Sequence, residues 1–594
     1  MESIYLISDF SDKIKRLAER LQVPAENIIS YQNKENESGY HSWLNSEFKS
    51  KEIDKIIIPV SISNDHTINT IGLLLGLHIR LNYELSLKKR LIPIIFLSNF
   101  TVENLIKMNS FDPDSNPQNL IFTKGVYFSF FDIEDIQKTV ELATPFSDDD
   151  YQKGVLTKLN IHRKEDLGGG HDIANAWGCF KVSQVIGIDS KIFQLESISK
   201  HLKQLYAKYL ICKNETFSNE QRIDLNPIKC NGKNILFIDD KSDEGWAELM
   251  KNLFRGAGDN FKYVDSSKYK ADDLHKSFKD FDGFYKECHS NIGKDWDLII
   301  IDLRLNPEKE DIDNEMIVPT DFSGYKLIDE FLTKNEGYQI IVLTASNKIW
   351  NINAALKRGA SSYFIKESPE FNFPVSETKK LLDKFKSDVK VCFDRGYLKQ
   401  VFKAKQDLIH SINEMKYGSD FLEILKNQLN LAYYLLSKAE TKEQFAYAYV
   451  SLYMIIETVN NDFVVKTTNN EWVLNITNEP LLDWTYNTNT KSYINTNTTV
   501  FGDKPPEWIK LAGLYFQNWN GQEQSFVQKI YQLITKRNGF IHNDKRILDK
   551  TKKDKNGEDV LDNNKKPIYL NHDIYEPKGF IELFEVIQKV IGYL

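Results

Sequence analysis

Three aspartates, a threonine and a lysine follow four apolar runs in the middle of this sequence. The runs span residues 235–238, 298–301, 340–343 and 363–365, and the residues after them are Asp239-Asp240, Asp302, Thr344 and Lys366. Each run is short and rich in β-branched or aromatic residues, which is typical of a strand buried on both faces of a parallel sheet. Because open α/β sheets bind ligands at their carboxyl edge, we expect these polar side chains to form one site there.

These residue types suit the transfer of a phosphoryl group to a carboxylate. Asp239 and Asp240 can hold Mg²⁺, an ion that takes one or two carboxylates and keeps several waters. Asp302 would share that ion and attack the phosphorus, forming an acyl phosphate. Thr344 would donate a hydrogen bond to a phosphoryl oxygen, and Lys366 would neutralise its charge. The alternative is an α/β domain with incidental acids at its strand ends.

The order of these residues resembles the receiver domain of two-component response regulators. The resemblance implies that Asp239 and Asp240 are the acidic pair that binds Mg²⁺ together with Asp302. It further implies that Asp302 is the phospho-acceptor, and that a sensor histidine kinase is the phosphoryl donor. Thr344 would then be the switch hydroxyl and Lys366 the phosphate-binding lysine.

One further position fits the receiver pattern, and two features depart from it. Tyr363, three residues before the lysine, matches the switch aromatic of the family. Asp302 follows Asp240 by 62 positions, which is longer than in a plain receiver, so we expect a charged insertion within residues 268–294. Lys366 is followed by Glu-Ser-Pro rather than directly by proline, which changes the last loop.

The elements around this site belong to a longer, multidomain chain. With 594 residues, 41% hydrophobic and 27% charged, the chain is expected to contain about three to five domains. We predict an α/β domain at 1–150, a helical connector and linker at 151–230, a receiver at 231–392 and a helical bundle at 393–594. The predicted fold class is multidomain, α/β plus all-α. Its parts are an N-terminal receiver-like α/β domain, a central doubly wound (βα)5 receiver domain and a C-terminal helical bundle.

Composition and charge exclude several classes of protein. The net charge of -8 argues against a protein that coats nucleic acid nonspecifically. No apolar stretch approaches the length of a membrane span, and no signal peptide is predicted, so we expect a cytoplasmic protein without a membrane partner. The cysteines form no CxxC pair, which fits a reducing compartment. They stand at positions 179, 212, 230, 288 and 392.

Residues 1–150 alternate strand-like and helix-like segments, a pattern that predicts βαβ units and a parallel sheet. The order of elements parallels that of the receiver, but the chemical positions are absent. The first strand is followed by Ser8-Asp9-Phe10, the central one by Val60-Ser61 and the fourth by Ser98-Asn99, so no acid matches Asp302. We interpret this segment as a degenerate receiver-like domain that binds a partner; another small α/β domain is the alternative.

The connector contains three consecutive glycines, Gly168 to Gly170, followed by His171 and Asp172. This pattern predicts the start of a helix, with Asp172 favourable in its first turn. His171 and Asn175 are four residues apart and would share one helical face. His171 is either a phosphoacceptor or a capping and packing residue.

A second set of chemical residues lies near the end of a predicted helix at 525–542. Arg537 and His542 are five residues apart, a spacing that can bring both side chains to one pocket. Histidine acts as a general acid or base near neutral pH. Arginine can clamp a phosphate and stabilise the transition state of its substitution. With the 2′-hydroxyl of RNA as nucleophile, this pair would cleave RNA without a metal.

The pattern Arg-Asn-x₃-His in a C-terminal bundle resembles the HEPN superfamily. The resemblance covers roughly residues 400–594 and implies that Arg537, Asn538 and His542 are catalytic. An upstream helix that ends near Glu457 adds the acidic candidate of that family. HEPN bundles commonly dimerise so that two Arg/His sets form one ribonuclease site, and many are noncatalytic binding modules. Gly539 inside the motif lowers helix propensity at this point.

Together these patterns predict a response regulator whose phosphorylation controls a HEPN endoribonuclease. The expected partners are a histidine kinase, an RNA substrate and a second copy of the chain, and antiviral defence or toxin action is the suggested role. The alternative is a noncatalytic signalling adaptor in which the bundle only dimerises or binds a ligand or partner. A DNA-binding transcription regulator is disfavoured by the acidic charge and the lack of an ordinary helix-turn-helix.

Overall fold

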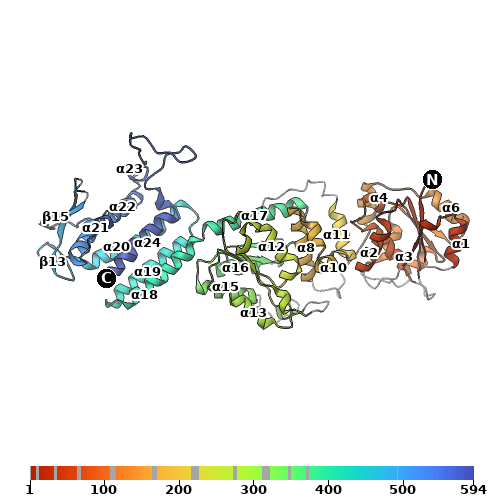
Figure 1. Cartoon of the computed structure of the whole chain (residues 1–594), viewed down its shortest axis with the longest axis horizontal. Coiled ribbons are helices and arrows are strands. Elements are labelled where there is room, and N and C mark those ends of the chain that lie inside the picture. Colours follow the sequence, from red (N-terminus) through yellow and green to blue (C-terminus); the bar gives the residue numbers. More distant parts are fainter. Residues whose placement is uncertain are drawn as a thin grey trace. The chain divides into compact units, whose positions relative to one another are not determined.

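The computed structural model divides the chain into two compact units (Figure 1). The first comprises Met1–Glu330 and Gln339–Phe393, and the second comprises Phe331–Tyr338 and Asp394–Leu594. The structure describes all residues except 1, 9–11, 32–36, 63–68, 108–114, 163–169, 216–226, 272–276, 311–321, 346–348, 370–372, 488 and 491.

The first unit begins with a five-stranded parallel sheet in the order β2-β1-β3-β4-β5. Successive side chains of a strand point to opposite faces of the sheet. Leu6, Ile57 and Ile95 accordingly pack under one set of helices, and Tyr5, Ile7 and their neighbours under the other. The strands are β1 (Ile4–Ser8), β2 (Ile28–Ser30), β3 (Lys55–Pro59), β4 (Ile94–Ser98) and β5 (Val126–Phe130).

Helices cover both faces of this sheet. Ile14 of α1 and Ile136 of α6 belong to one core, while α2 and α3 contribute to the other. Every residue of α3 is buried, as its almost wholly apolar sequence requires. The elements are α1 (Asp12–Arg20), η1 (Ala25–Asn27), α2 (Glu37–Phe48), α3 (Ile71–Arg80), α4 (Leu87–Arg90), α5 (Val102–Lys107), η2 (Pro117–Phe122) and α6 (Ile133–Leu142).

A series of helices connects this sheet to the next. Lys208 of α11 contacts His78 of α3, with 2.9 Å between Nζ and Nδ1, and Tyr209 donates a hydrogen bond to the carbonyl of Leu156 at 3.0 Å. These contacts tie the end of the connector to the N-terminal domain. The elements are α7 (Asp148–Tyr151), η3 (Gln152–Leu156), α8 (Gly170–Ile186), α9 (Asp189–Phe193), α10 (Glu196–Leu202) and α11 (Leu205–Glu215).

The second sheet repeats the topology of the first, with the parallel order β10-β9-β8-β6-β7. In sequence order both sheets follow the 2-1-3-4-5 arrangement of a doubly wound fold, which places a ligand site at the carboxyl edge. The prediction of parallel α/β sheets of the receiver type is therefore confirmed. The strands are β6 (Ile235–Ile238), β7 (Phe261–Tyr263), β8 (Leu298–Asp302), β9 (Ile340–Thr344) and β10 (Ser362–Ile365).

Additional structure accounts for part of the long interval between Asp240 and Asp302. A short helix, η7 (Ser266–Tyr269), and a bridge between Lys270 and Phe278 precede α13, within the segment where we expected an insertion. The remaining helices are η5 (Ser242–Trp246), α12 (Ala247–Leu253), η6 (Arg255–Asn260), α13 (Phe281–His289), α14 (Pro307–Glu310), α15 (Ser323–Lys334), α16 (Ile349–Arg358) and α17 (Val375–Asp394).

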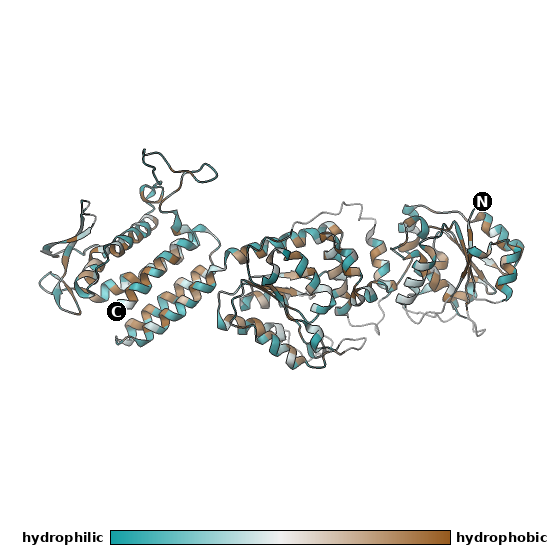
Figure 2. Ribbon diagram, viewed as in Figure 1, coloured by the Kyte–Doolittle hydropathy of each residue, from teal (hydrophilic) through white to brown (hydrophobic). Residues whose placement is uncertain are grey.

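The second unit consists mainly of helices. Its longest helix, α20, starts with a capping box in which Thr441 and Gln444 satisfy each other's backbone amides. Both polar and apolar residues occur along each long helix, as expected of amphipathic helices (Figure 2). The helices are α18 (Tyr397–Glu414), α19 (Ser419–Ser437), α20 (Lys442–Phe463), α21 (Glu507–Gly513), η9 (Leu514–Asn518), α22 (Gln524–Ile541), α23 (Lys545–Leu548), η10 (His572–Tyr575) and α24 (Pro577–Tyr593).

Two small antiparallel sheets lie between α20 and α21. Four of their five strands lie in an Asn- and Thr-rich segment at 467–503. The strands are β11 (Val464–Lys466), β12 (Trp472–Leu474), β13 (Glu479–Pro480), β14 (Leu482–Asn487) and β15 (Ser492–Thr499). None of the described helices is long and apolar enough to cross a membrane.

The core of the second unit depends on buried apolar side chains of α20. Leu452 is fully buried, so we expect Leu452→Ala to lower the free energy of unfolding of this unit by about 2–5 kcal/mol, because it leaves a cavity. Met454, two residues along the same helix, is 43% exposed, and Met454→Ala is the control with little expected effect. Chemical denaturation followed by circular dichroism measures both. Equal losses in the two variants would contradict this packing.

Candidate functional site

The structure brings Asp239, Asp240 and Asp302 together at the carboxyl edge of the second sheet. The first two follow β6 and the third ends β8, and these strands are adjacent and parallel. All three side chains are buried, and each offers a carboxylate oxygen within 4.8 Å of the others. Three oxygen ligands from carboxylates form the kind of ligand set that a hard divalent cation takes.

Lys366 reaches the same three-acid cluster from the end of β10. Its backbone N–H donates to the carbonyl of Thr344 at 2.7 Å, which extends the pairing of β10 with β9 and directs the side chain over the sheet edge. Its Nζ lies 2.6 Å from Asp302 Oδ2 and 2.9 Å from Asp239 Oδ2. Burial alone would lower the pKa of this ammonium, but Asp239 and Asp302 raise it above its usual range. Lys366 is therefore a fixed positive charge.

One ammonium does not balance the acids around it. Burial, and then repulsion from Asp302, raise the pKa of Asp239 to about 6 although Lys366 opposes the shift. Burial also raises the pKa of Asp240 well above its usual range, and Asp239 and Asp302 add to the effect. Although Asp239 Oδ2 lies near Lys366, it accepts no hydrogen bond. This excess of buried carboxylate fits a divalent cation, which would stabilise the ionised acids.

A second set of buried charges lies beside the acids. Lys241 donates its backbone N–H to Asp239 Oδ1 at 2.7 Å, and its ammonium pairs with Glu244 at 3.0 Å. Lys270 pairs with Asp243 at 2.7 Å and with Glu244 at 3.2 Å. These pairs come from the loop after β6 and from the additional structure after η7. They fix the loop that carries the acidic pair.

The two predicted switch residues occupy the neighbouring strands β9 and β10. Thr344 is buried at the end of β9, one strand from Asp302. Tyr363 is half-buried on β10, and Lys384 Nζ of α17 lies 5.1 Å from the centroid of its ring. Thr344 thus lies one strand from Asp302 and Tyr363 lies against Lys384 of α17, and their roles as switches remain predictions.

One residue that lies in the site was not predicted from the sequence. Asn175 of α8 accepts a hydrogen bond from Lys366 Nζ at 2.7 Å and is buried. We noted Asn175 only as a neighbour of His171 on a helical face, and the side chain of His171 lies outside the described residues. A contact between residues 191 positions apart leaves no periodic signal in the sequence.

The corresponding edge of the N-terminal sheet has a different chemistry. Buried Ser8 and Ser98 end β1 and β4, and Pro59 ends β3. Among the residues that the structure describes, no carboxylate ends these three strands; Asp9 lies outside them. The described residues of this edge thus offer hydroxyl groups, whereas the second sheet has Asp302 at the end of β8.

In the helical unit, Arg537 is held by an acid from another helix. Its Nη2 donates to Glu457 Oε1 at 2.6 Å and its Nη1 to Asn538 Oδ1 at 2.9 Å. Its guanidinium carbon lies 5.2 Å from the centroid of the Tyr453 ring. The structure thus brings together three of the four residues singled out from the sequence. His542 is exposed, directly after the end of α22.

Gly539 does not interrupt α22, which continues to Ile541. A Cβ atom at this position would lie 2.8 Å from Cγ2 of Ile547 in α23. The glycine is therefore explained by close packing between two helices. Its lower helix propensity is offset by this packing, which sequence analysis did not anticipate.

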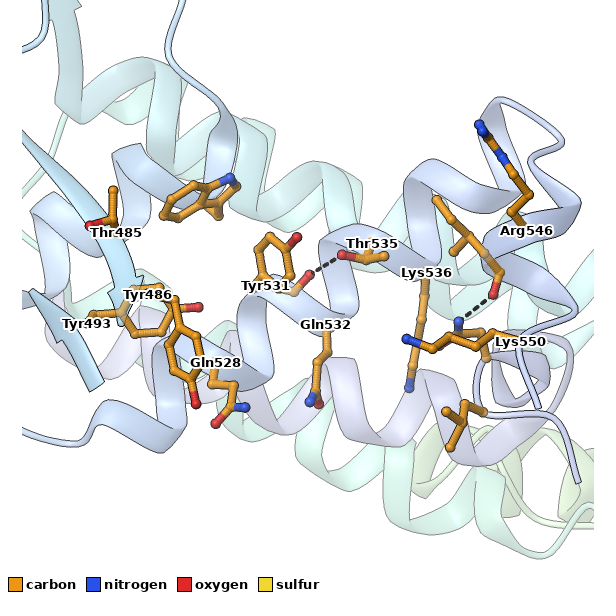
Figure 3. A pocket seen from close by; sticks show the side chains of 14 residues that line it. Thr485, Tyr486, Tyr493, Gln528, Tyr531, Gln532, Thr535, Lys536, Arg546 and Lys550 are labelled. Atoms are coloured by element: carbon orange, nitrogen blue, oxygen red, sulfur yellow. Dashed lines mark hydrogen bonds between the residues drawn. The ribbon is translucent and has the colours of Figure 1, made fainter. Parts of the chain in front are cut away.

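A cavity of about 790 Å³ lies on another face of α22 (Figure 3). Arg537 and His542 are not among its lining residues. Aromatic rings occupy one end of the cavity and basic side chains the other, with amide and hydroxyl groups of α22 between them. The lining residues include Tyr486, Tyr493, Trp508, Gln528, Tyr531, Gln532, Thr535, Lys536, Arg546 and Lys550.

Comparison with known proteins finds receiver-like sequence at the N-terminus. Residues 5–129 match the family described as "iREC: Inactive Receiver domain". The match covers the sheet whose strand ends lack the acids, which agrees with the word inactive. The chain therefore contains a receiver-related domain. No curated protein matches the chain.

One solved structure also resembles the chain. It is a response regulator protein from Burkholderia pseudomallei, determined with a phosphorylated aspartic acid, a calcium ion and citrate. The two are 20% identical, and the match covers 31% of this chain and 87% of the other. The TM-score is 0.16, which is too low to indicate a common fold over the whole chain.

Removing the ammonium of Lys366 should destabilise the second sheet. We expect Lys366→Met to lower the free energy of unfolding by about 3–5 kcal/mol at neutral pH, because it leaves buried carboxylates without their countercharge. Lys380→Met is the control, since that side chain is 71% exposed and its pair with Glu377 contributes little. Urea denaturation measures both variants. A Lys366→Met protein as stable as the control would contradict the proposed charge balance.

Proposed function

We propose that this protein is a response regulator in which phosphorylation of Asp302 controls cleavage of RNA by the C-terminal helical unit. The observation that carries the first part is the convergence of three buried carboxylates and Lys366 at one sheet edge. An α/β domain with incidental acids has no reason to bury them together, because unpaired buried charge is costly.

The proposed input reaction is phosphoryl transfer from a histidine kinase. A carboxylate oxygen of Asp302 attacks the phosphorus of a phosphohistidine, an O–P bond forms, and the P–N bond breaks to release imidazole. Mg²⁺ bound by Asp239, Asp240 and Asp302 would neutralise charge on the phosphoryl oxygens. Lys366 supplies a second positive charge, and Thr344 donates a hydrogen bond to one phosphoryl oxygen.

The proposed output is RNA cleavage through the 2′-hydroxyl. His542 takes the hydroxyl proton and the 2′-oxygen attacks the adjacent phosphorus. The bond to the 5′-oxygen of the next nucleotide breaks, and this oxygen takes a proton from water. The products are a 2′,3′-cyclic phosphate and a 5′-hydroxyl end. Arg537 stabilises the charge on the phosphoryl oxygens, and Glu457 and Asn538 orient it, as their contacts with the guanidinium indicate.

The cavity on α22 supports RNA as the substrate. Tyr486, Trp508 and Tyr531 offer rings on which bases can stack, and Lys550 adds an exposed positive charge. Because Arg537 and His542 do not line this cavity, we assign to it the binding of the strand and not its cleavage. A homodimer that combines two Arg/His sets remains a prediction, as do a cytoplasmic location and a role in antiviral defence.

A second candidate function is that of a noncatalytic adaptor. It is favoured by the observation that Arg537 already pairs with Glu457, which can be a purely structural interaction. In this case the helical unit binds a ligand or a partner. The N-terminal domain, whose sheet edge lacks the acids, would dock a kinase or another regulator in either case.

Asp302 should be the residue that acquires phosphate. With acetyl phosphate and Mg²⁺, we expect the protein to gain one acid-labile phosphoryl group, and Asp302→Asn to gain none, because the amide is not a nucleophile. Asp282→Asn, which removes an exposed acid of α13, is the control and should behave as the unmodified protein. Intact-mass spectrometry measures the incorporation. Equal labelling of Asp302→Asn would exclude this residue as the acceptor.

RNA cleavage should depend on the arginine and the histidine. We expect Arg537→Ala and His542→Ala each to reduce cleavage by about 10²–10³-fold, the usual effect of removing a transition-state donor or a general base. Lys529→Ala removes a positive charge from the same helix and should leave the rate unchanged. The assay uses the phosphorylated full chain and a labelled single-stranded RNA. Equal rates in all proteins, or no cleavage in any, would favour the adaptor.

A further inference from the structure

Helix α8 of the connector lies against the carboxyl edge of the second sheet. Asp172, Asn175 and Gly178 are spaced three residues apart and contact the loops that carry the acid cluster and Lys366. Residues at this spacing share one face of a helix. One face of α8 thus contacts the site at which phosphorylation is proposed.

Asn175 accepts a hydrogen bond from the ammonium of Lys366, the group that a phosphoryl oxygen would also need as a donor. A lysine ammonium has three N–H donors. In this structure Nζ of Lys366 lies within 2.9 Å of oxygens of Asp239, Asp302 and Asn175. Two of these donors are hydrogen-bonded, to Asp302 and Asn175, and Asp239 forms an ion pair with the same ammonium. An oxygen of a phosphoryl group on Asp302 would compete with Asn175 for this ammonium.

The backbone of α8 approaches the last loop of the receiver closely. A Cβ atom on Gly178 would lie 3.0 Å from the carbonyl oxygen of Glu367 and 3.1 Å from its nitrogen. Cys179 Sγ lies 3.0 Å from the position of a Cβ on Gly245 in η5. Glycine at both positions allows contact at a distance that a larger residue would prevent.

Charged contacts hold the two ends of this face. Asp172 pairs with Lys241, the residue directly after the acidic pair, at 2.8 Å. Lys181 and Glu367 are both buried and attract each other. Glu367 stands where the receiver pattern has proline, so this departure from the pattern is explained by its contact with the connector.

Docked α8 also lies near the buried phospho-acceptor, since Asn175 and Asp302 bond the same ammonium. The side chain of Asp302 is 8% exposed, although a kinase must bring a phosphohistidine to its oxygens. All residues from Ile173 to Ser183 are buried, so α8 is enclosed by its neighbours, which include α9 and α10. Undocking of α8 would therefore make Asp302 more accessible to a phosphoryl donor.

We propose that α8 is an internal plug of the receiver site, and that docking of α8 and phosphorylation of Asp302 exclude each other. This proposal rests on the proposed function of Asp302 as the acceptor. The phosphoryl group adds negative charge and three oxygens where Asn175 now lies. Lys366 exchanges its bond to the amide oxygen for one to a phosphoryl oxygen, and α8 leaves the sheet edge. Phosphorylation is thereby converted into movement of the segment that connects the two sheets.

Alkylation of Cys179 tests the plug directly. This cysteine is on α8 and fully buried, so its reaction with N-ethylmaleimide reports undocking. We expect beryllofluoride with Mg²⁺, a mimic of the phosphoryl group, to raise the alkylation rate of Cys179 about tenfold or more, the change that loss of one charge-assisted hydrogen bond produces. Cys392, buried on α17, is the internal control and should stay protected. Peptide mass spectrometry reads both sites.

Two variants of α8 provide a second measurement. Asn175→Ala removes the bond to Lys366, and Gly178→Leu places a side chain against the backbone of Glu367. Both should raise the alkylation of Cys179 without any mimic, and both should speed labelling of Asp302 by acetyl phosphate. Gln184→Ala, at a half-exposed position of the same helix, should change neither rate.

The possible results separate the two proposals. If beryllofluoride binds, as fluorine NMR shows, while Cys179 stays protected, the plug is wrong. It is also wrong if both α8 variants alkylate and phosphorylate like the Gln184→Ala control. If the α8 variants expose Cys179 but no protein takes a phosphoryl group on Asp302, the contact of α8 stands and the proposed phosphorylation fails.

Discussion

The ammonium of Lys366, buried among carboxylates, is the interaction on which this structure depends. Transferring one charge from water to a protein interior is costly, and the cost is offset only by close partners. Asp239 and Asp302 supply these partners from two adjacent strands. The parallel sheet brings these carboxylates to the ammonium, because its strands end at one edge. The helices around it then have to exclude water from that edge while keeping its charges paired.

The chain uses the same sheet topology twice, and the difference between the copies lies at the strand ends. Among the described residues, the strands of the first sheet end in hydroxyl and apolar groups. The second carries Asp239, Asp240 and Asp302, whose mutual repulsion makes it sensitive to any cation or phosphoryl group placed among them. The two copies of the fold therefore differ in the negative charge that their described residues bring to this edge. This contrast agrees with the match of residues 5–129 to an inactive receiver.

Much of the central fold and its acid cluster was predictable because both depend on local patterns. Short apolar runs define the strands, and the polar residue after each run marks the edge, so Asp302 and Lys366 could be identified without coordinates. The contact of Asn175 with Lys366 was not predictable, since it joins two segments far apart in the sequence and needs no periodicity in either. Gly539 shows the same limit: its propensity suggested a weak helix, while its role depends on Ile547 of another element. Local sequence patterns indicate the secondary structure that a segment favours, and tertiary contacts determine which structure it adopts.

The chemical nature of Asn175 explains why a plug at this position would be reversible. A carboxylate there would add a fourth negative charge beside Asp239, Asp240 and Asp302 and bind Lys366 strongly. An amide oxygen is neutral and accepts a weaker hydrogen bond than a charged oxygen does. It can satisfy a donor of Lys366 while the site is unphosphorylated, and it is the weaker competitor once a phosphoryl oxygen is present. The exchange therefore has a direction set by charge.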